Sequence, residues 1–208
     1  MEYLDTYDEN MHFTGKYPRD YVHENALWHN TVHCWLYDNE GNIYFQIRKD
    51  ENKLYTTASG HVMAGESVKE AFGREIKEEI GIDVDYDKAS LVNIYIFKMD
   101  KTKSDGSVFR DRAFSNVYIS EFDNDYSKFH FDTSEINGLV KVNAKEAIEL
   151  FKKEKGNINA QIILSNNDNI TIEEKTIDFS DFLVNKNETA IGKYGDILRK
   201  VIECTNIS

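Results

Sequence analysis

Hydrophobic and polar positions along the chain follow two different periods. Runs rich in β-branched and aromatic residues, bounded by turn residues, are typical of strands, whereas apolar residues repeated every three or four positions are typical of helices. The first pattern predicts strands over residues 3–7, 31–37, 42–49, 89–99 and 113–120 and a hairpin over residues 161–174. The second predicts helices over residues 68–80, within 140–156 and over 193–204, and a short helix after Pro18. Elements mixed in this way favour an α/β sandwich.

Turn-forming residues mark the connections between these elements. DEN at residues 8–10, TGK at 14–16 and DNEG at 38–41 predict turns, and residues 50–59 are expected to form a loop. Asn143 with Glu146 three positions later indicates the start of the helix within 140–156. The chain contains neither an internal repeat nor a low-complexity linker, so one domain is expected.

The segment GESVKEAFGREIKEEIG, residues 65–81, predicts a helix with both ends marked. Ser67 and Glu70 have the spacing of a capping box, and Gly81 suits the residue that follows a helix. At about 100° per residue, one face of this helix is apolar. That face is formed by Ala71, Phe72, Ile76 and Ile80.

Three glutamates of this helix stand where apolar side chains are expected. Glu75 and Glu79 fall inside the apolar face and Glu78 lies at its edge. Burying a carboxylate without a partner is costly, and like charges four residues apart repel. We therefore expect the carboxylates to line a crevice and bind Mg²⁺ or Mn²⁺, because these ions prefer oxygen ligands, with Arg74 orienting them. A charged helix edge in solvent is the alternative.

Composition limits the classes of partner. The 208-residue chain carries a formal net charge of −12, which argues against non-specific binding to nucleic acid and against docking on an anionic membrane. No run approaches the roughly 18 apolar residues of a membrane span, and the acidic N-terminus lacks the features of a signal peptide. Cys34 and Cys204 show neither metal-binding nor redox spacing, so a reduced, cytoplasmic protein is expected.

The acidic helix and the loop before it also carry a family spacing. The fixed positions are Gly60, Glu66, Arg74–Glu75–Ile76, Glu78–Glu79 and Gly81–Ile82, and their intervals resemble those of the Nudix box. The resemblance implies a Nudix-type α/β/α sandwich with a mixed β-sheet and extra C-terminal elements. It implies a single Nudix domain over residues 1–208, with an N-terminal extension over about 1–29, a core over about 30–156 and a C-terminal elaboration over about 157–208.

The same resemblance implies roles for individual residues. Metal ligands would be Glu75, Glu79, Glu78 and the carbonyl of Gly60, and catalytic residues would be Glu78, Glu79, Arg74 and Glu135. Glu78 is either a ligand or a base, and Glu135 is either a base outside the box or an exposed loop acid. Arg48 and His61 are the candidates for contact with substrate phosphate. The reaction implied is metal-dependent hydrolysis of a diphosphate linkage in a nucleoside diphosphate derivative or related small molecule.

Residues 3–150 look like the isopentenyl-diphosphate-isomerase-like branch of Nudix proteins. Two groups that the isomerases use are replaced here, because their cysteine position is Ser59 and their glutamate position is Ala113, with Asp111 nearby. A serine hydroxyl is too weak an acid to replace a thiol in protonating an alkene. The histidines that match isomerase metal ligands are His23, His29 and His61. Each either binds a metal, contacts substrate phosphate or satisfies local hydrogen bonds.

Three functions therefore stay open, in order of preference. The first is a metal-dependent hydrolase, the second an isomerase disfavoured by Ser59 and Ala113, and the third a non-catalytic module that binds a nucleotide or metabolite. The sequence gives neither the substrate nor the role of residues 157–208. It also leaves the oligomeric state open, with a homodimer as one option.

Overall fold

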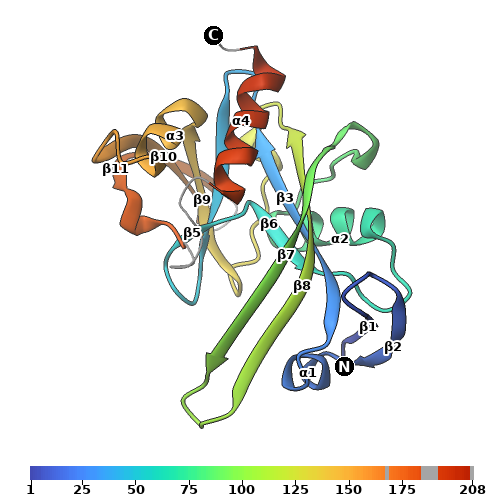
Figure 1. The fold of residues 1–208 in the computed structure, drawn as a ribbon. Helices are drawn as coiled ribbons and strands as arrows, with labels where there is room; N and C mark the ends of the chain where they lie inside the picture. Colours follow the sequence, from blue (N-terminus) through green and yellow to red (C-terminus); the bar gives the residue numbers. More distant parts are fainter. Residues whose placement is uncertain (167–168, 184–191, 207–208) are drawn as a thin grey trace.

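The computed structural model describes residues 1–166, 169–183 and 192–206, and they share one large sheet with helices on both faces (Figure 1). The N-terminal elements are β1 (Tyr3–Tyr7), β2 (Phe13–Pro18) and α1 (Arg19–Glu24). The central elements are β3 (Trp28–Tyr37), β4 (Asn42–Arg48), β5 (Leu54–Tyr55), β6 (Ala58–His61), α2 (Val68–Ile80), β7 (Ser90–Thr102), β8 (Val108–Glu121) and β9 (Ile136–Asn143). The C-terminal elements are α3 (Ala144–Phe151), β10 (Asn157–Asn166), β11 (Asn169–Asp178) and α4 (Lys193–Thr205).

The sheet is mixed, as expected. Its main path runs β11–β10–β9–β4–β3–β1–β2, and β8 pairs with β3 in parallel from His29↔Ala113 to Tyr37↔Glu121. β7 pairs antiparallel with β8, and the two form a long ribbon that extends beyond the body of the molecule (Figure 1). Among the described residues, no helix combines the length and hydropathy needed to cross a bilayer.

Alternation along β3 separates two cores, one on each face of the sheet. Cys34 and Leu36 belong to the core that α2 covers, together with Phe72. Trp35 belongs to the other core, which includes residues of α3 and α4. Because successive side chains of a strand point to opposite faces, this single strand contributes to both layers. The α/β/α sandwich is therefore confirmed, and Figure 1 shows α2 and α4 on opposite sides of the sheet.

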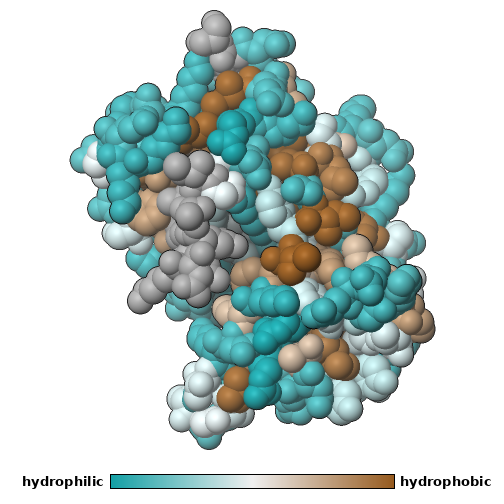
Figure 2. Space-filling model, viewed as in Figure 1, coloured by the Kyte–Doolittle hydropathy of each residue, from teal (hydrophilic) through white to brown (hydrophobic). Residues whose placement is uncertain are grey.

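The outer strand β7 carries an apolar edge. Leu91, Ile94 and Ile96 remain 39–65% exposed, and Figure 2 shows hydrophobic surface gathered over this region. Among the described strands β7 pairs only with β8.

The sheet is split next to its centre, and this split positions the candidate site. β3 and β4 pair only at Tyr37↔Ile43. Beyond that pair they diverge, because β6 pairs with β3 and β5 pairs with β4. A gap between β4 and β6 thus faces α2, and side chains of α2 can reach through it.

Most predicted elements are confirmed, two predictions about strands are wrong, and one strand, β9, was not predicted. α2 spans Val68–Ile80 as expected, and the hairpin and the last helix are present. The expected turn at 14–16 lies inside β2, a mostly exposed strand whose polar sequence lacks clear alternation. The expected loop 50–59 contains β5 and the start of β6, which are too short to give a periodic signal. β9 was not expected because it runs directly into the helix capped by Asn143, whose side chain accepts from the amides of Lys145 and Glu146.

Candidate active site

The ends of α2 are fixed by its own sequence. The amide of Glu70 donates to Ser67 Oγ at 3.2 Å, and Glu70 Oε2 accepts from the amide of Ser67 at 2.8 Å, which completes the capping box. Gly81 ends the helix with φ of 80°. A side chain there would be strained and would meet His130, since an added Cβ would lie 2.5 Å from His130 Cβ. These local constraints determine which residues α2 turns toward the sheet.

Glu79 reaches into the gap between β4 and β6. Its side chain is buried, and Oε2 accepts from Gln46 Nε2 at 3.1 Å and from the amide of Ser59 at 3.3 Å. Burial raises the pKa of Glu79 well above its usual value, and the nearby charges of Glu75 and Glu135 raise it further. The neutral donors around Glu79 hold the side chain in place without neutralising its charge.

Glu75 lies against the backbone of β6. A Cβ added to Gly60 would be 2.2 Å from the carboxyl carbon of Glu75, so this approach requires glycine. Burial raises the pKa of Glu75 to about 7, although Arg74 opposes the shift. The third glutamate, Glu78, has a side chain 58% exposed at the mouth of the site.

Arg74 ties the loop before α2 to the helix. Its Nε and Nη2 donate to the two carboxylate oxygens of Glu66 at 2.8 and 2.9 Å, and Nη2 also donates to the carbonyl of His61 at 2.9 Å. Its Nη1 donates to Glu75 at 2.6 Å and to Glu78 at 3.0 Å. The guanidinium therefore supplies the positive charge between Glu75 and Glu78 in this structure. The orienting role of Arg74 stays a prediction, and these contacts are the geometry that it requires.

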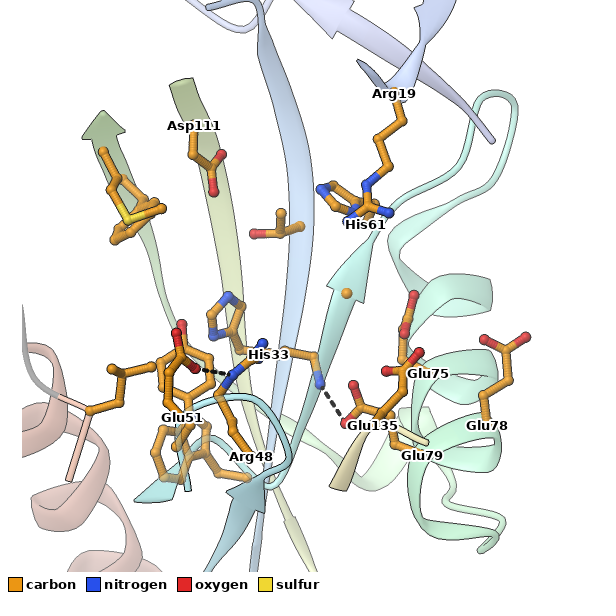
Figure 3. A pocket seen from close by; sticks show the side chains of 18 of the residues that line it. Arg19, His33, Arg48, Glu51, His61, Glu75, Glu78, Glu79, Asp111 and Glu135 are labelled. Carbon is orange, nitrogen blue, oxygen red and sulfur yellow. Dashed lines mark hydrogen bonds and ion pairs between the residues drawn. The ribbon is translucent and has the colours of Figure 1, made fainter. Parts of the chain in front are cut away.

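All the site residues expected from the sequence line one cleft of about 650 Å³. These residues are Arg48, Gly60, His61, Arg74, Glu75, Glu78, Glu79 and Glu135. Figure 3 shows Glu135, from the segment before β9, beside Glu75 and Glu79. Arg48 lies farther along the cleft, where Nε donates to Glu51 at 2.9 Å and the guanidinium lies over the Tyr55 ring. His61 contacts Glu2, with 3.5 Å between Nδ1 and Oε1.

The acidic group fits a hard divalent cation by its chemistry. Glu75 and Glu79 present carboxylate oxygens to a partly enclosed cleft, and both carboxylates have pKa values raised by burial. A cation bound there would stabilise the ionised carboxylates. The carboxylates of Glu75, Glu78, Glu79 and Glu135 do not form a tight cluster in this structure. Among the described residues, the one group of three ligand atoms that lie close together is a histidine cluster.

That histidine cluster adjoins the cleft, which His61 and the nearby Asp111 line. The ligand nitrogens of His23 on α1, His29 on β3 and His61 on β6 are all within 4.8 Å of one another. Oδ1 of Asp111, on β8, is 3.5 Å from His29 Nε2. His23 Nε2, His29 Nε2 and Asp111 Oδ1 are buried and lack a hydrogen-bond partner in the part of the chain that the structure describes. Burial lowers the pKa of His29 to about 4, so these rings are neutral and can act as metal ligands.

Comparison with known proteins identifies the family. A model of the NUDIX domain matches residues 27–162. The chain belongs to the Nudix family. An uncharacterised Nudix hydrolase of Clostridium acetobutylicum is 29% identical over 211 residues, covering 97% of this chain and 98% of that one. Nudix hydrolase 3 of Arabidopsis thaliana is 26% identical over 125 residues, covering 57% of this chain and 16% of its own length.

A solved structure supports the fold of this Nudix domain. The protein DR0079 of Deinococcus radiodurans matches with a TM-score of 0.51 and 21% identity, covering 74% of this chain and 90% of that one. The Nudix family to which this protein belongs is hydrolytic and acts on pyrophosphate bonds, and Nudix hydrolases generally use a divalent cation.

Several residues of the Nudix cleft were not anticipated from the sequence. Gln46 holds Glu79, and His33 and Trp35 line the cleft from β3. Lys193 and Tyr194 line it from α4, in the C-terminal part whose role the sequence left open. The alternation of Thr31, His33 and Trp35 on one face of β3 was the available signal, although apolar burial explains such alternation equally well.

Proposed function

We propose that this Nudix protein is a Mg²⁺- or Mn²⁺-dependent hydrolase that cleaves a diphosphate linkage in a nucleoside diphosphate derivative or related phosphorylated metabolite. The supporting observation is that Glu75 and Glu79 are buried together in a cleft, each with a raised pKa. A helix that needed only solubility would leave these carboxylates in water. The cleft volume of about 650 Å³ is ample for a nucleotide-sized ligand.

Each residue of the cleft takes a stated part in this proposal. Glu75, Glu79, Glu78 and the carbonyl of Gly60 would hold the cation, and Arg74 would keep Glu75 and Glu78 oriented. When bound, the cation neutralises phosphate charge and lowers the pKa of an attacking water. Glu135 lies beside Glu75 and Glu79 and would accept the proton of that water (Figure 3). Arg48 and His61 would contact the phosphates.

We also propose that the chain falls in the isopentenyl-diphosphate-isomerase-like branch. The histidine cluster with Asp111 is the observation that favours this placement, and its orphaned buried atoms fit a bound divalent ion. Isomerase activity itself is disfavoured. Ser59 offers only a hydroxyl, and Ala113, 1% exposed, offers no acid or base. The isomerase therefore stays the second candidate, and a non-catalytic binding module the third.

A substrate screen separates the three candidates. The wild type and Glu79→Gln are assayed against nucleoside diphosphate derivatives and isopentenyl diphosphate with Mg²⁺ or Mn²⁺. Phosphate-bond cleavage that Glu79→Gln reduces by at least about 100-fold supports the hydrolase, because one metal-binding carboxylate is lost. Glu149→Gln, which alters an exposed ion pair with Lys155, is the matched control and keeps full activity. Allylic product would support the isomerase, and binding without turnover would support the binding module.

A further inference from the structure

A second group of polar side chains lines the same cleft away from the carboxylates. His33 and Trp35 share one face of β3, and Lys193 is the first residue of α4. Trp35 is 1% exposed, and its indole N–H has no hydrogen-bond partner among the described residues. An unpaired buried donor costs about 1–3 kcal/mol. Trp35 lies on the cleft wall, so a ligand atom would supply the missing acceptor once the side chains that cover the indole N–H shift aside.

The contact between Lys193 and His33 determines which ring nitrogen of His33 carries the proton. Lys193 Nζ and His33 Nδ1 are 3.2 Å apart, and an ammonium group can only donate. Nδ1 of His33 must therefore accept and carries no proton. Burial and the charge of Lys193 keep the pKa of His33 well below its usual value, so the ring is neutral. Its one proton is then on Nε2, which makes that nitrogen a donor as well.

The three side chains therefore offer donors of one kind to a ligand. Lys193 brings an ammonium group, His33 an imidazole N–H and Trp35 an indole N–H. The ring of Tyr194, next to Lys193 in sequence, lies 5.6 Å from the ring of Trp35, which brings α4 against β3 at this place. Donors combined with one positive charge recognise an oxyanion through charge-assisted hydrogen bonds.

Neighbouring charges do not reverse this preference. Among the residues that the structure describes, Glu51 lines this part of the cleft, and its carboxylate is paired with Arg48 Nε at 2.9 Å (Figure 3). The glutamates of α2 gather on another side of the cleft, where an anion needs a cation to bind. The cleft thus has one region that takes phosphate only together with metal and another that takes an oxyanion directly.

We propose that Lys193, His33 and Trp35 form an oxyanion site that binds a phosphate or carboxylate group of the substrate separate from the diphosphate that is cleaved. The substrate would then be a diphosphate compound that carries a further anionic group. This substrate assignment rests on the proposed hydrolase function, whereas the oxyanion site itself does not. The C-terminal helix α4 would determine substrate choice by supplying Lys193.

The test measures binding of inorganic phosphate and of malonate to the full-length protein in EDTA, so that no metal contributes. Calorimetry gives the affinity. Tryptophan emission gives the location in a Trp28→Phe background, because the chain has two tryptophans and Trp28 stacks on Phe114 outside the cleft. We expect saturable binding with a change in Trp35 emission. Tighter binding of phosphate or of malonate identifies the group that the site prefers.

Substitutions decide whether the binding is at this site. Lys193→Met should weaken binding by about 10-fold or more, since it removes a charge-assisted hydrogen bond. Lys200→Met is the matched control, because Lys200 lies on the same helix and pairs with Glu203. Absence of saturable heat with both anions, or equal affinities in the two variants, would overturn the proposal. Glu79→Gln should keep anion binding while losing hydrolysis, so a failed oxyanion site and a failed hydrolase assignment give different results.

Discussion

Glu75 occupies the space that a side chain at position 60 would need, because a Cβ on Gly60 would lie 2.2 Å from the Glu75 carboxyl carbon. The strand β6 and the helix α2 thus approach each other at a carboxylate, which we propose as a metal ligand, rather than at an apolar contact. The contact sets the position of Glu75 relative to the carbonyl of Gly60. Both groups are proposed ligands of the same cation.

Gly60→Ala is expected to lower hydrolysis by about 100-fold while the fold persists. The added methyl group displaces the end of a flexible side chain, and a shift of about 1 Å in a catalytic group has an effect of this size. Steady-state kinetics with Mg²⁺ or Mn²⁺ measures the loss, and far-ultraviolet circular dichroism checks the fold. Gly73→Ala is the matched control on α2, since a Cβ added to Gly73 would meet no atom within 4 Å. It should keep activity and raise stability by about 0.5–1 kcal/mol. Equal activities of the two variants would contradict the proposed geometry.

Arg74→Lys is expected to reduce both activity and stability. Lysine cannot reproduce the paired contacts to Glu66 together with the bonds to Glu75 and the His61 carbonyl. We expect a loss of about 1–3 kcal/mol in the free energy of unfolding, because partly buried charge-assisted bonds are broken. Chemical denaturation measures this loss. Lys77 lies on the same helix and forms an exposed ion pair with Asp83, so Lys77→Arg should change neither activity nor the free energy of unfolding. If Arg74→Lys is as stable as the wild type, Arg74 does not stabilise the loop before α2 against the helix.

Glu75 is expected to contribute stability to the metal-free protein that is lost as the pH rises, a trend opposite in sign to that of the histidines whose pKa values burial lowers. Burial raises the pKa of Glu75 from 4.5 to about 7, so the folded state holds this proton more tightly than the unfolded state. The stabilisation is complete below pH 4.5 and is lost as the pH rises through about 7. Its size is on the order of 3 kcal/mol.

Denaturation in EDTA between pH 5 and pH 8 tests this dependence. The wild type should lose stability relative to Glu75→Gln as the pH rises, because the glutamine has no proton to lose while the other shifted groups, Glu79 among them, are common to both proteins. Mn²⁺ should raise the melting temperature more at pH 8 than at pH 5, since binding of the ion competes with protonation of Glu75. A metal effect of the same size at both pH values would contradict the assignment of Glu75 as a ligand.

Local signals explain what could be predicted from the sequence. Ser67, Glu70 and Gly81 define α2 within a few residues, and the inward angle of Glu75 and Glu79 follows from the same helix. β9 could not be predicted in this way, because it runs without a break into the helix capped by Asn143, and its partner β4 is distant in sequence. The same holds in the site, where His33 and Lys193 are 160 residues apart and meet only in the folded chain. Spacing identifies the residues of one segment, whereas a cleft wall built from several segments requires the tertiary structure.

The histidine cluster gives the last prediction, which concerns a second divalent ion. His23 Nε2, His29 Nε2 and Asp111 Oδ1 are buried without hydrogen-bond partners in the described chain, and neutral imidazoles suit Zn²⁺ or Co²⁺ better than Mg²⁺. We expect Co²⁺ to bind there and to give visible d–d absorption that His29→Asn removes. Glu79→Gln should retain this absorption while losing hydrolysis, because Glu79 belongs to the carboxylate site.

The control for this prediction is His12→Asn, at an exposed histidine that contacts Asp8. It should leave the Co²⁺ spectrum unchanged. Absorption that persists in His29→Asn would place the ion elsewhere, and absence of any Co²⁺ band would leave these histidines as packing residues. If the wild type binds Co²⁺ at the cluster and His29→Asn loses this binding but keeps hydrolysis, the ion takes no part in the reaction. The carboxylate site would then carry the chemistry alone. Loss of both the absorption and hydrolysis in His29→Asn would show that hydrolysis depends on the histidine cluster.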